Sequence, residues 1–121
     1  MERLVGEGWS LGVFRDGDQL QIALPVDSSF ISTSFEFSCS DEDYRVLAED
    51  DFRRHVLDFI LHEWLQPTML RDGPKRDEAK MLAVIKTVLH GSLEDVETEI
   101  DSCPQPSRAR YRLETMRGDI A

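Results

Sequence analysis

The sequence has little positive charge, few cysteines and no long apolar run. Its 121 residues include 14 Lys and Arg against 24 Asp and Glu, which gives a formal net charge of -10. This balance argues against phosphate backbones and anionic membranes as partners and favours a basic one. No stretch approaches the roughly 18 apolar residues of a membrane helix, and the first residues lack the layout of a signal peptide. We therefore expect a cytoplasmic protein that binds neither nucleic acid nor membrane.

The two cysteines, Cys39 and Cys103, are far apart in the sequence. They form no C-x-x-C pair and no Cys/His spacing that is typical of zinc. In a cytoplasmic protein both are expected to be reduced thiols. Cys39 ends an apolar alternation with Phe35 and Phe37, so we interpret it as a small buried hydrophobic residue.

The sequence shows no nucleophile elbow and no phosphate-binding glycine motif. Its G-x-S-x-G string, Gly8 to Gly12, runs into the predicted strand of residues 9–15 and does not form a strand-to-helix turn, and G-x-G-x-x-G does not occur. His62-Glu63 begins the zinc-protease string H-E-x-x-H, but Gln66 stands where the second histidine is required. His55, Asp58 and His62 share one helical stripe, which we interpret as a solvated polar face rather than a metal site. We therefore expect a non-enzyme without metal or cofactor; an enzyme whose site assembles only in the folded chain is a third alternative.

One compact α+β domain fits the residues that are present. A hydrophobic fraction of 40% in 121 residues is enough for one core. We assign residues 1–107 to this domain and residues 108–121 to a loosely attached, Arg-rich C-terminal tail. The tail has a net charge of +2 and leaves -12 on the rest of the chain. Its arginines are Arg108, Arg110, Arg112 and Arg117.

The strongest strand signal is Asp16-Gly17, a dipeptide that accepts the positive φ angles of a two-residue hairpin turn. Such a turn places Arg15 opposite Asp18. It then pairs Val13 with Leu20, Leu11 with Ile22 and Trp9 with Leu24, all on one face. Gly6, Gly8 and Gly12 are scattered through the first strand region, and we interpret them as marking a frayed start and a close-packed or bulged strand position rather than a phosphate-binding loop.

Pro25 has no amide proton and should end the second strand. The alternation of Phe35, Phe37 and Cys39 predicts a third strand over residues 30–39. The N-terminal part is therefore an antiparallel hairpin or three-stranded meander, packed against three to four helices.

Helix signals begin at Ser40, which forms a capping box with Asp43. A short first piece leads into a stronger helix from about Asp50 to Gln66, halted by Pro67, and whether these are one helix or two is open. The stronger piece has so broad an apolar arc that it should be a central helix contacted by several elements. That arc contains Phe52, Val56, Leu57, Phe59, Ile60, Leu61, Trp64 and Leu65.

Two further helices are predicted beyond a connector at residues 67–74. The first starts after Pro74, covers about Lys75 to His90 and stops at Gly91. Its apolar face contains Met81, Leu82, Val84, Ile85, Val88 and Leu89. The second opens at Ser92, ends near Ser102 and carries mostly acidic residues.

Clustered carboxylates are the remaining functional signal. The most one-sided cluster lies between Lys86 and Arg108, a stretch without any Lys or Arg. A negative face raises association rates with a basic partner, although charge runs are also typical of solvated helix faces. The residues that we predict to bind a partner are Glu94, Asp95, Glu97, Glu99, Asp101, Asp50 and Asp51. Asp41, Glu42 and Asp43 form a further acidic cluster.

The segment from Phe35 to Leu65 reads FEFSCSDEDYRVLAEDDFRRHVLDFILHEWL. It resembles small acidic bacterial proteins found beside polymorphic toxins, including immunity proteins of contact-dependent growth inhibition. The resemblance implies a cytoplasmic protein that binds one cognate toxin domain, possibly a nuclease, and neutralises it. Aromatic residues such as Trp9, Phe30 or Tyr44 could then anchor the interface.

An alternative function belongs to a different class. A small regulatory or chaperone-like adaptor of a basic cellular protein would have the same acidic charge and the same salt-sensitive binding. The two functions differ in partner, because an immunity protein rescues cells from one toxin and an adaptor binds a housekeeping protein.

Overall fold

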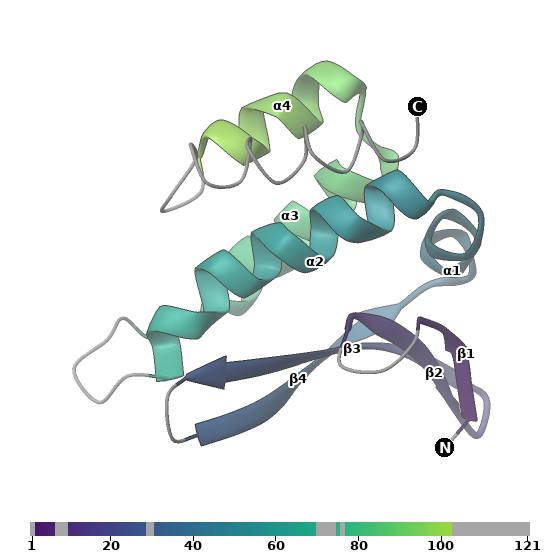
Figure 1. The fold of residues 1–121 in the computed structure, drawn as a ribbon. Coiled ribbons are helices and arrows are strands. Elements are labelled where there is room, and N and C mark those ends of the chain that lie inside the picture. Colours follow the sequence, from purple (N-terminus) through teal and green to yellow (C-terminus); the bar gives the residue numbers. More distant parts are fainter. Residues whose placement is uncertain (1, 7–9, 29–30, 70–74, 76, 103–121) are drawn as a thin grey trace.

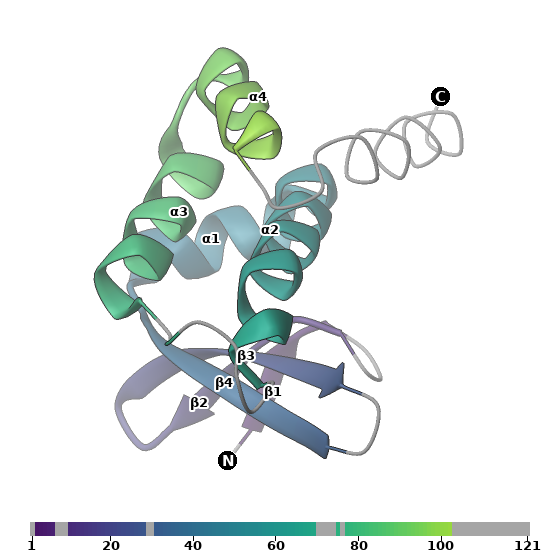
Figure 2. The ribbon, with the colours of Figure 1, turned by 90° about the vertical axis from the view of Figure 1, so that its left-hand side faces the viewer.

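The described part of the chain forms three layers: a sheet, the helices α1, α2 and α3 on one of its faces, and the outer helix α4 (Figure 1). The computed structural model describes residues 2–6, 10–28, 31–69, 75 and 77–102. The strands, adjacent in the sheet in chain order, are β1 (Glu2–Val5), β2 (Gly12–Asp16), β3 (Gln19–Ser28) and β4 (Ile31–Cys39). The helices are α1 (Asp41–Glu49), α2 (Asp51–Leu65), the 3-10 helix η1 (Gln66–Met69), α3 (Glu78–His90) and α4 (Leu93–Asp101). The view in Figure 2 shows the helices on one side of the sheet and α4 farthest from it.

The predicted α+β fold is confirmed, with one strand more than expected. β1 gives no sequence signal because only Val5 among its four residues is buried, so no alternation marks it. It packs tightly on β2: a Cβ at Gly12 would lie 2.7 Å from the Val5 carbonyl oxygen. The pairing shifts register between Arg3 and Val5. The close-packed position expected of the early glycines is therefore found at Gly12, whereas the irregular pairing lies in β1 and not at a glycine.

The β2–β3 hairpin turns at Gly17-Asp18, one residue later than predicted. Arg15 consequently pairs with Leu20 and not with Asp18. Gly17 has φ +63° and takes the first turn position, which leaves the second to Asp18, a residue type that tolerates turns well. Val13 lies opposite Ile22, two residues from its predicted partner. A shift of two keeps each side chain on its face, and both are fully buried as predicted.

Pro25 does not end β3, contrary to prediction. It pairs with Ser34 of β4 in a strand that continues to Ser28. β2 pairs with β3 only as far as Ala23, so beyond this point β3 has one neighbouring strand. A residue without an amide proton is tolerated where one edge of the strand is open.

Residues 41–65 form two helices that meet at Asp50. The Ser40 capping box is present, with the Ser40 hydroxyl accepting from the Asp43 amide at 3.0 Å. Asp50 has an extended backbone, with φ -116° and ψ 92°, and its carboxylate caps α2 through the Arg53 amide at 3.0 Å. One aspartate therefore ends α1 and begins α2. Pro67 lies in η1, directly after α2 ends.

α2 is the central helix of the core, as its broad apolar arc predicted. It packs against α1, α3, η1 and β3. Its fully buried residues are Val56, Leu57, Ile60, Leu61 and Leu65. Glu63 is buried as well, with only 7% of its surface exposed, which the sequence pattern did not indicate.

α3 begins three residues later than predicted, at Glu78 rather than Lys75. The carboxylate of Asp77 accepts from the Lys80 amide at 3.0 Å and so fixes this start. The predicted apolar face was also too wide, because Leu82 is 38% exposed. Gly91 ends the helix as expected.

Several predictions lie outside the described residues: the structure makes no statement on Trp9, Phe30, Pro74, Cys103 or the Arg-rich tail. In the part of the chain that is described, no helix has the length and apolar character needed to cross a membrane.

The Arg53 guanidinium joins the start of α2 to the end of α3. It donates to the carbonyl oxygens of Val88 and Gly91 at 2.8 and 2.9 Å and pairs with Asp50 at 3.3 Å. These carbonyls belong to the last turn and the cap of α3, where helices leave acceptors unpaired and favour cations. The arginine therefore fixes the turn that leads into α4.

We expect Arg53→Met to lower the free energy of unfolding by about 2–4 kcal/mol, because two charge-assisted hydrogen bonds are lost. Urea denaturation at pH 7 measures this. The control is Arg45→Met, since Arg45 is an exposed arginine on α1; its loss should stay below about 1 kcal/mol. Equal losses in the two variants would contradict the role given to Arg53.

Cys39 is half-buried, so the predicted burial is found only in part. Burial, followed by the charges of Asp43 and Asp41, raises the pKa of its thiol from 9.0 to about 12. The thiolate is the reactive form, and its fraction at pH 8 falls by roughly 1,000-fold when the pKa rises from 9.0 to about 12. We therefore expect the native Cys103→Ser variant to react with iodoacetamide at pH 8 at least about 100-fold more slowly than free cysteine, because a thiolate of higher pKa is also the stronger nucleophile. Unfolding in urea should restore the rate. Fast alkylation of the native variant would contradict the raised pKa.

Candidate protein-binding surface

α4 carries five carboxylates and no Lys or Arg. Val96 and Ile100 are buried, and they fix the helix against α3. Their spacing of four residues turns the acidic positions towards solvent and the helix flanks. Glu94, Asp95 and Asp101 are exposed, whereas Glu97 and Glu99 are partly buried. We call these five residues the α4 surface.

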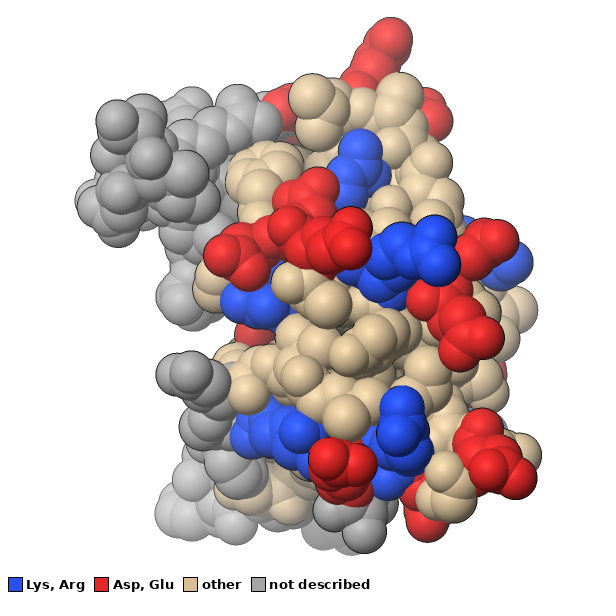
Figure 3. Space-filling view, turned by 90° about the vertical axis from the view of Figure 1, so that its right-hand side faces the viewer, with Lys and Arg blue, Asp and Glu red and all other residues tan. Residues whose placement is uncertain are grey.

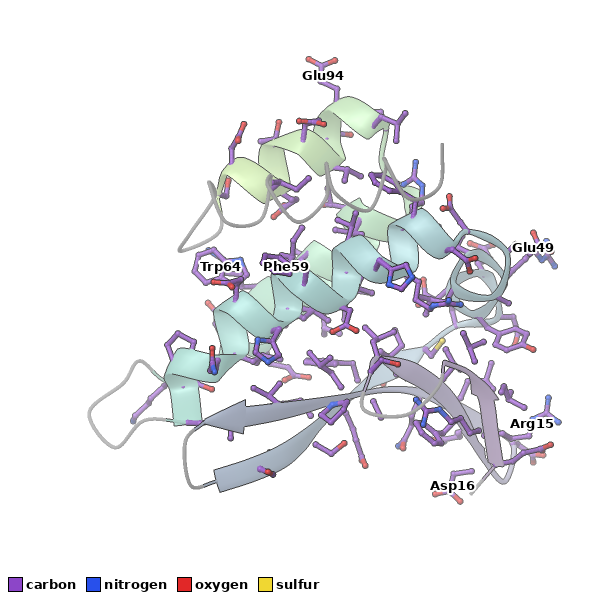
Figure 4. All side chains as sticks on the ribbon, viewed as in Figure 1. Arg15, Asp16, Glu49, Phe59, Trp64 and Glu94 are labelled. Atoms are coloured by element: carbon purple, nitrogen blue, oxygen red, sulfur yellow. The ribbon has the colours of Figure 1, made fainter. Side chains whose placement is uncertain are left out.

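The five carboxylates of the α4 surface differ in their interactions within the protein. The carboxylate of Asp95 closes the capping box by accepting from the Ser92 amide at 3.4 Å. Glu97, Glu99 and Asp101 each take part in interactions within the protein. Glu94 points away from the body of the molecule (Figure 4). The strongest outward charge is therefore at the first turn of α4.

An exposed apolar residue accompanies this charge. Leu93, the first residue of α4, is 59% exposed. Next to Glu94 it supplies an apolar contact beside a carboxylate, the combination from which interface cores and their polar rims are built.

Asp50 and Asp51, the other two predicted binding residues, have structural partners. Asp50 caps α2 and pairs with Arg53, and Asp51 pairs with Arg54 at 3.1 Å. Through Arg53 the structure places Asp50 beside Gly91, next to the start of α4. Their charges are largely balanced by these arginines, so they contribute less to a negative field than the residues of α4.

The first acidic turn of α1 is also tied to the end of α3. His90 Nε2 lies 2.6 Å from the Asp43 carboxylate. Burial opposes the charge on Asp43, but hydrogen bonds from His90 and Ser40 outweigh it and hold the pKa of this carboxyl below its usual 3.8. Sequence analysis missed this pair, although a histidine in the last turn of a helix is a typical position for binding an anion.

The three residues of the predicted polar stripe, His55, Asp58 and His62, differ in exposure and in their contacts. Asp58 accepts from the Leu11 amide at 3.1 Å and so ties the sheet to α2. His55 is exposed and His62 is half-buried. Across residues 2–6, 10–28, 31–69, 75 and 77–102, no three His, Cys, Asp or Glu side chains are arranged to hold a metal ion.

An open cavity of about 610 Å³ lies between the first strands and α2, lined by Arg54, His55 and Asp58 among others. Two of these polar groups are already engaged, since Asp58 binds Leu11 and Arg54 binds Asp51 and the Leu47 carbonyl. On the side of the molecule seen in Figure 3, acidic and basic side chains are interspersed. This mixed side contrasts with the single sign of charge on α4.

Comparisons with protein-family models, curated proteins and solved structures give no match to this chain.

We expect Asp43→Asn to lower the free energy of unfolding at pH 7 by about 1–2 kcal/mol. A lowered pKa means that ionised Asp43 stabilises the fold above pH 3.8, and that this contribution disappears as the pH falls through the lowered value. Urea denaturation between pH 7 and pH 2 should therefore show the two proteins converging below pH 3.8.

The control is Asp41→Asn, an exposed neighbour in the same helical turn, which should change stability by about 0.5 kcal/mol or less. A difference between wild type and Asp43→Asn that persists unchanged to pH 2 would contradict the assignment.

Proposed function

We propose that this protein is a non-catalytic immunity protein that binds a cognate bacterial toxin domain through the α4 surface. The observation that carries the proposal is the one-sided charge of α4, the helix farthest from the sheet among the described elements. A helix in this position can meet a partner without any change in the core.

Charge and shape favour a basic partner. Toxins that act on nucleic acids need basic clefts to hold phosphate, and an acidic inhibitor approaches such a cleft faster than diffusion alone allows. Glu94 supplies outward charge at the start of α4, Asp101 is exposed at its end, and Leu93 supplies an apolar contact. The affinity then depends on a few residues that become buried in the interface, and the association rate depends on the negative electrostatic field of α4.

The resemblance to immunity proteins supports the same class. The resembling segment, Phe35 to Leu65, coincides with β4, α1 and α2 and therefore with the scaffold. α4 lies outside it. A common scaffold that presents a separate recognition helix is what proteins with different cognate partners require, because specificity depends on contacts that differ between partners.

The first test is affinity capture from a lysate of the source cell with the tagged chain as bait, eluted by a salt gradient and identified by mass spectrometry. We expect one basic toxin domain, whose toxicity in a growth assay is abolished when the chain is co-expressed. A housekeeping protein as the sole specific partner would contradict the proposal and favour an adaptor. Turnover of a metabolite by the purified chain would favour an enzyme.

The second test locates the surface. Glu94→Lys with Asp101→Lys should slow association with the captured toxin domain at least about tenfold at low ionic strength. The control reverses two exposed sheet residues, Asp16→Lys with Glu36→Lys, at the same change in net charge; Asp16 lies at the end of the molecule opposite Glu94 (Figure 4). Stopped-flow or surface plasmon resonance measures the rates, and circular dichroism verifies folding.

If the two double variants slow association equally, net charge alone steers the encounter and α4 is not the contact. If neither double variant changes the association rate, electrostatic steering does not contribute to binding and this part of the proposal is wrong. Raising the ionic strength should remove most of the difference between the α4 variant and wild type, because screening acts on exposed charges first.

A further inference from the structure

The two outer strands of the sheet present different edges. β1 is four residues long, two of them charged, and its pairing with β2 shifts register between Arg3 and Val5. Short length, charge and irregular pairing are features that keep an edge strand from pairing with another chain. β4 is nine residues long, contains no proline and a single charged residue, Glu36, and pairs with β3 without interruption. In the described part of the chain no strand pairs with its outer edge, so β4 is an unprotected edge strand.

The register of the β3–β4 hairpin determines which backbone groups of β4 point to this outer edge. Ser28 pairs with Ile31 across residues 29–30, and a connection of this length closes on a hydrogen-bonded pair. Every second position from Ile31 onwards therefore bonds to β3. The N–H and C=O groups of the positions between them point to the outer edge, and these positions are Ser32, Ser34, Glu36 and Ser38.

Pro25 supports this alternation independently. The same rule applied to β3 directs the backbone of Leu24 to β4 and that of Pro25 to the opposite side, where β2 pairs no further than Ala23. A proline in a strand is tolerated where its missing amide proton has no partner strand to bond to. The position of Pro25 is therefore the one that the alternation requires.

Small exposed side chains flank the outer edge of β4. Phe35 and Phe37 are buried and hold the strand against the core. Ser34 and Ser38 are exposed on the opposite face of the sheet. A strand that adds to this edge meets hydroxyl groups on that face, and such groups pair favourably across strands.

A second copy of β4 is complementary to this edge. Antiparallel pairing about a two-fold axis at Phe35 uses the whole strand and forms about eight backbone hydrogen bonds. It places Glu36 opposite Ser34 of the second copy, whereas an axis at Glu36 would place two carboxylates opposite each other. The full-length register is therefore also the one that avoids this repulsion.

We propose that two copies of the chain associate through β4 in this register and join their four-stranded sheets into one. The net charge of -10 on each chain opposes association, and an edge contact buries little apolar area. We therefore expect a weak dimer, with a Kd on the order of 10–100 µM. Salt should strengthen the dimer, because screening weakens the repulsion between the two chains.

Dimerisation leaves the α4 surface open. α4 is the described helix farthest from the sheet, so strand pairing at β4 does not cover it (Figure 2). A dimer presents two acidic surfaces. A partner with two basic sites, or one that is itself dimeric, then binds with an effective concentration that a monomer lacks.

The first test is sedimentation equilibrium of the full chain from about 5 to about 500 µM, at low and at high ionic strength. We expect reversible dimerisation that becomes tighter in salt. Ser34→Pro removes an outward amide proton and should weaken the dimer at least about tenfold, while Ser34→Ala, which retains the amide proton, should not. Circular dichroism verifies that Ser34→Pro is folded, which we expect because its pairing partner in β3 is already Pro25.

The second test uses charge at the same position and does not depend on the proline variant. Ser34→Lys places an ammonium group opposite Glu36 of the second copy and should dimerise about tenfold more tightly than Ser34→Glu, which places a carboxylate there. Ser38→Lys and Ser38→Glu are the matched controls, because they make the same changes in net charge opposite Ser32. Their dimers should differ by about threefold or less.

A chain that stays monomeric at about 500 µM in salt would overturn the proposal, whether because another segment covers the edge or because the edge pairs only with a different protein. A dimer that is equally stable in Ser34→Pro and wild type would overturn the assignment to β4. A charge effect no larger at Ser34 than at Ser38 would overturn the register. Neither test uses a toxin, so their failure leaves the proposed function standing.

Discussion

The position of the candidate binding surface depends on the hydrogen bonds of the Arg53 guanidinium. The guanidinium donates hydrogen bonds to the carbonyl oxygens of Val88 and Gly91 and forms an ion pair with the Asp50 carboxylate. α4 starts two residues after Gly91, so the direction of its acidic face is set by the same turn. Only one of these contacts is local in the sequence. The surface is therefore oriented by a bond between the central helix and the end of α3.

The elements that were predicted correctly are those whose signals lie within a few neighbouring residues. Both capping boxes, at Ser40 and Ser92, are found because a cap and its third residue are read within one turn. The apolar arc of α2 and the alternation in β4 are equally local. Errors arose where a distant strand decides the outcome. Pro25 is tolerated because β2 pairs no further than Ala23, and β1 exists because β2 offers it an edge.

The candidate site divides in the same way. The acidic character of α4 is visible in the sequence, and the structure shows that α4 is the described helix farthest from the sheet. The sequence could not show that Asp50 caps α2 or that Asp51 pairs with Arg54, because an aspartate with a structural role and one that contacts a partner look the same in a sequence. The pairing of His90 with Asp43, 47 positions apart, and the burial of Glu63 need the tertiary fold. Each of these depends on which helices cross.

The acidity of α4 has a cost within the helix. Asp95 with Glu99 and Glu97 with Asp101 are like-charged pairs four residues apart, each destabilising by about 0.2–0.5 kcal/mol. Nothing in the packing of Val96 and Ile100 requires these carboxylates, so the core does not explain them. Asp95 closes the capping box, and Glu97, Glu99 and Asp101 take part in interactions within the protein, so part of this cost is offset inside the fold. Glu94, which points outward, is the carboxylate whose retention a basic partner would explain.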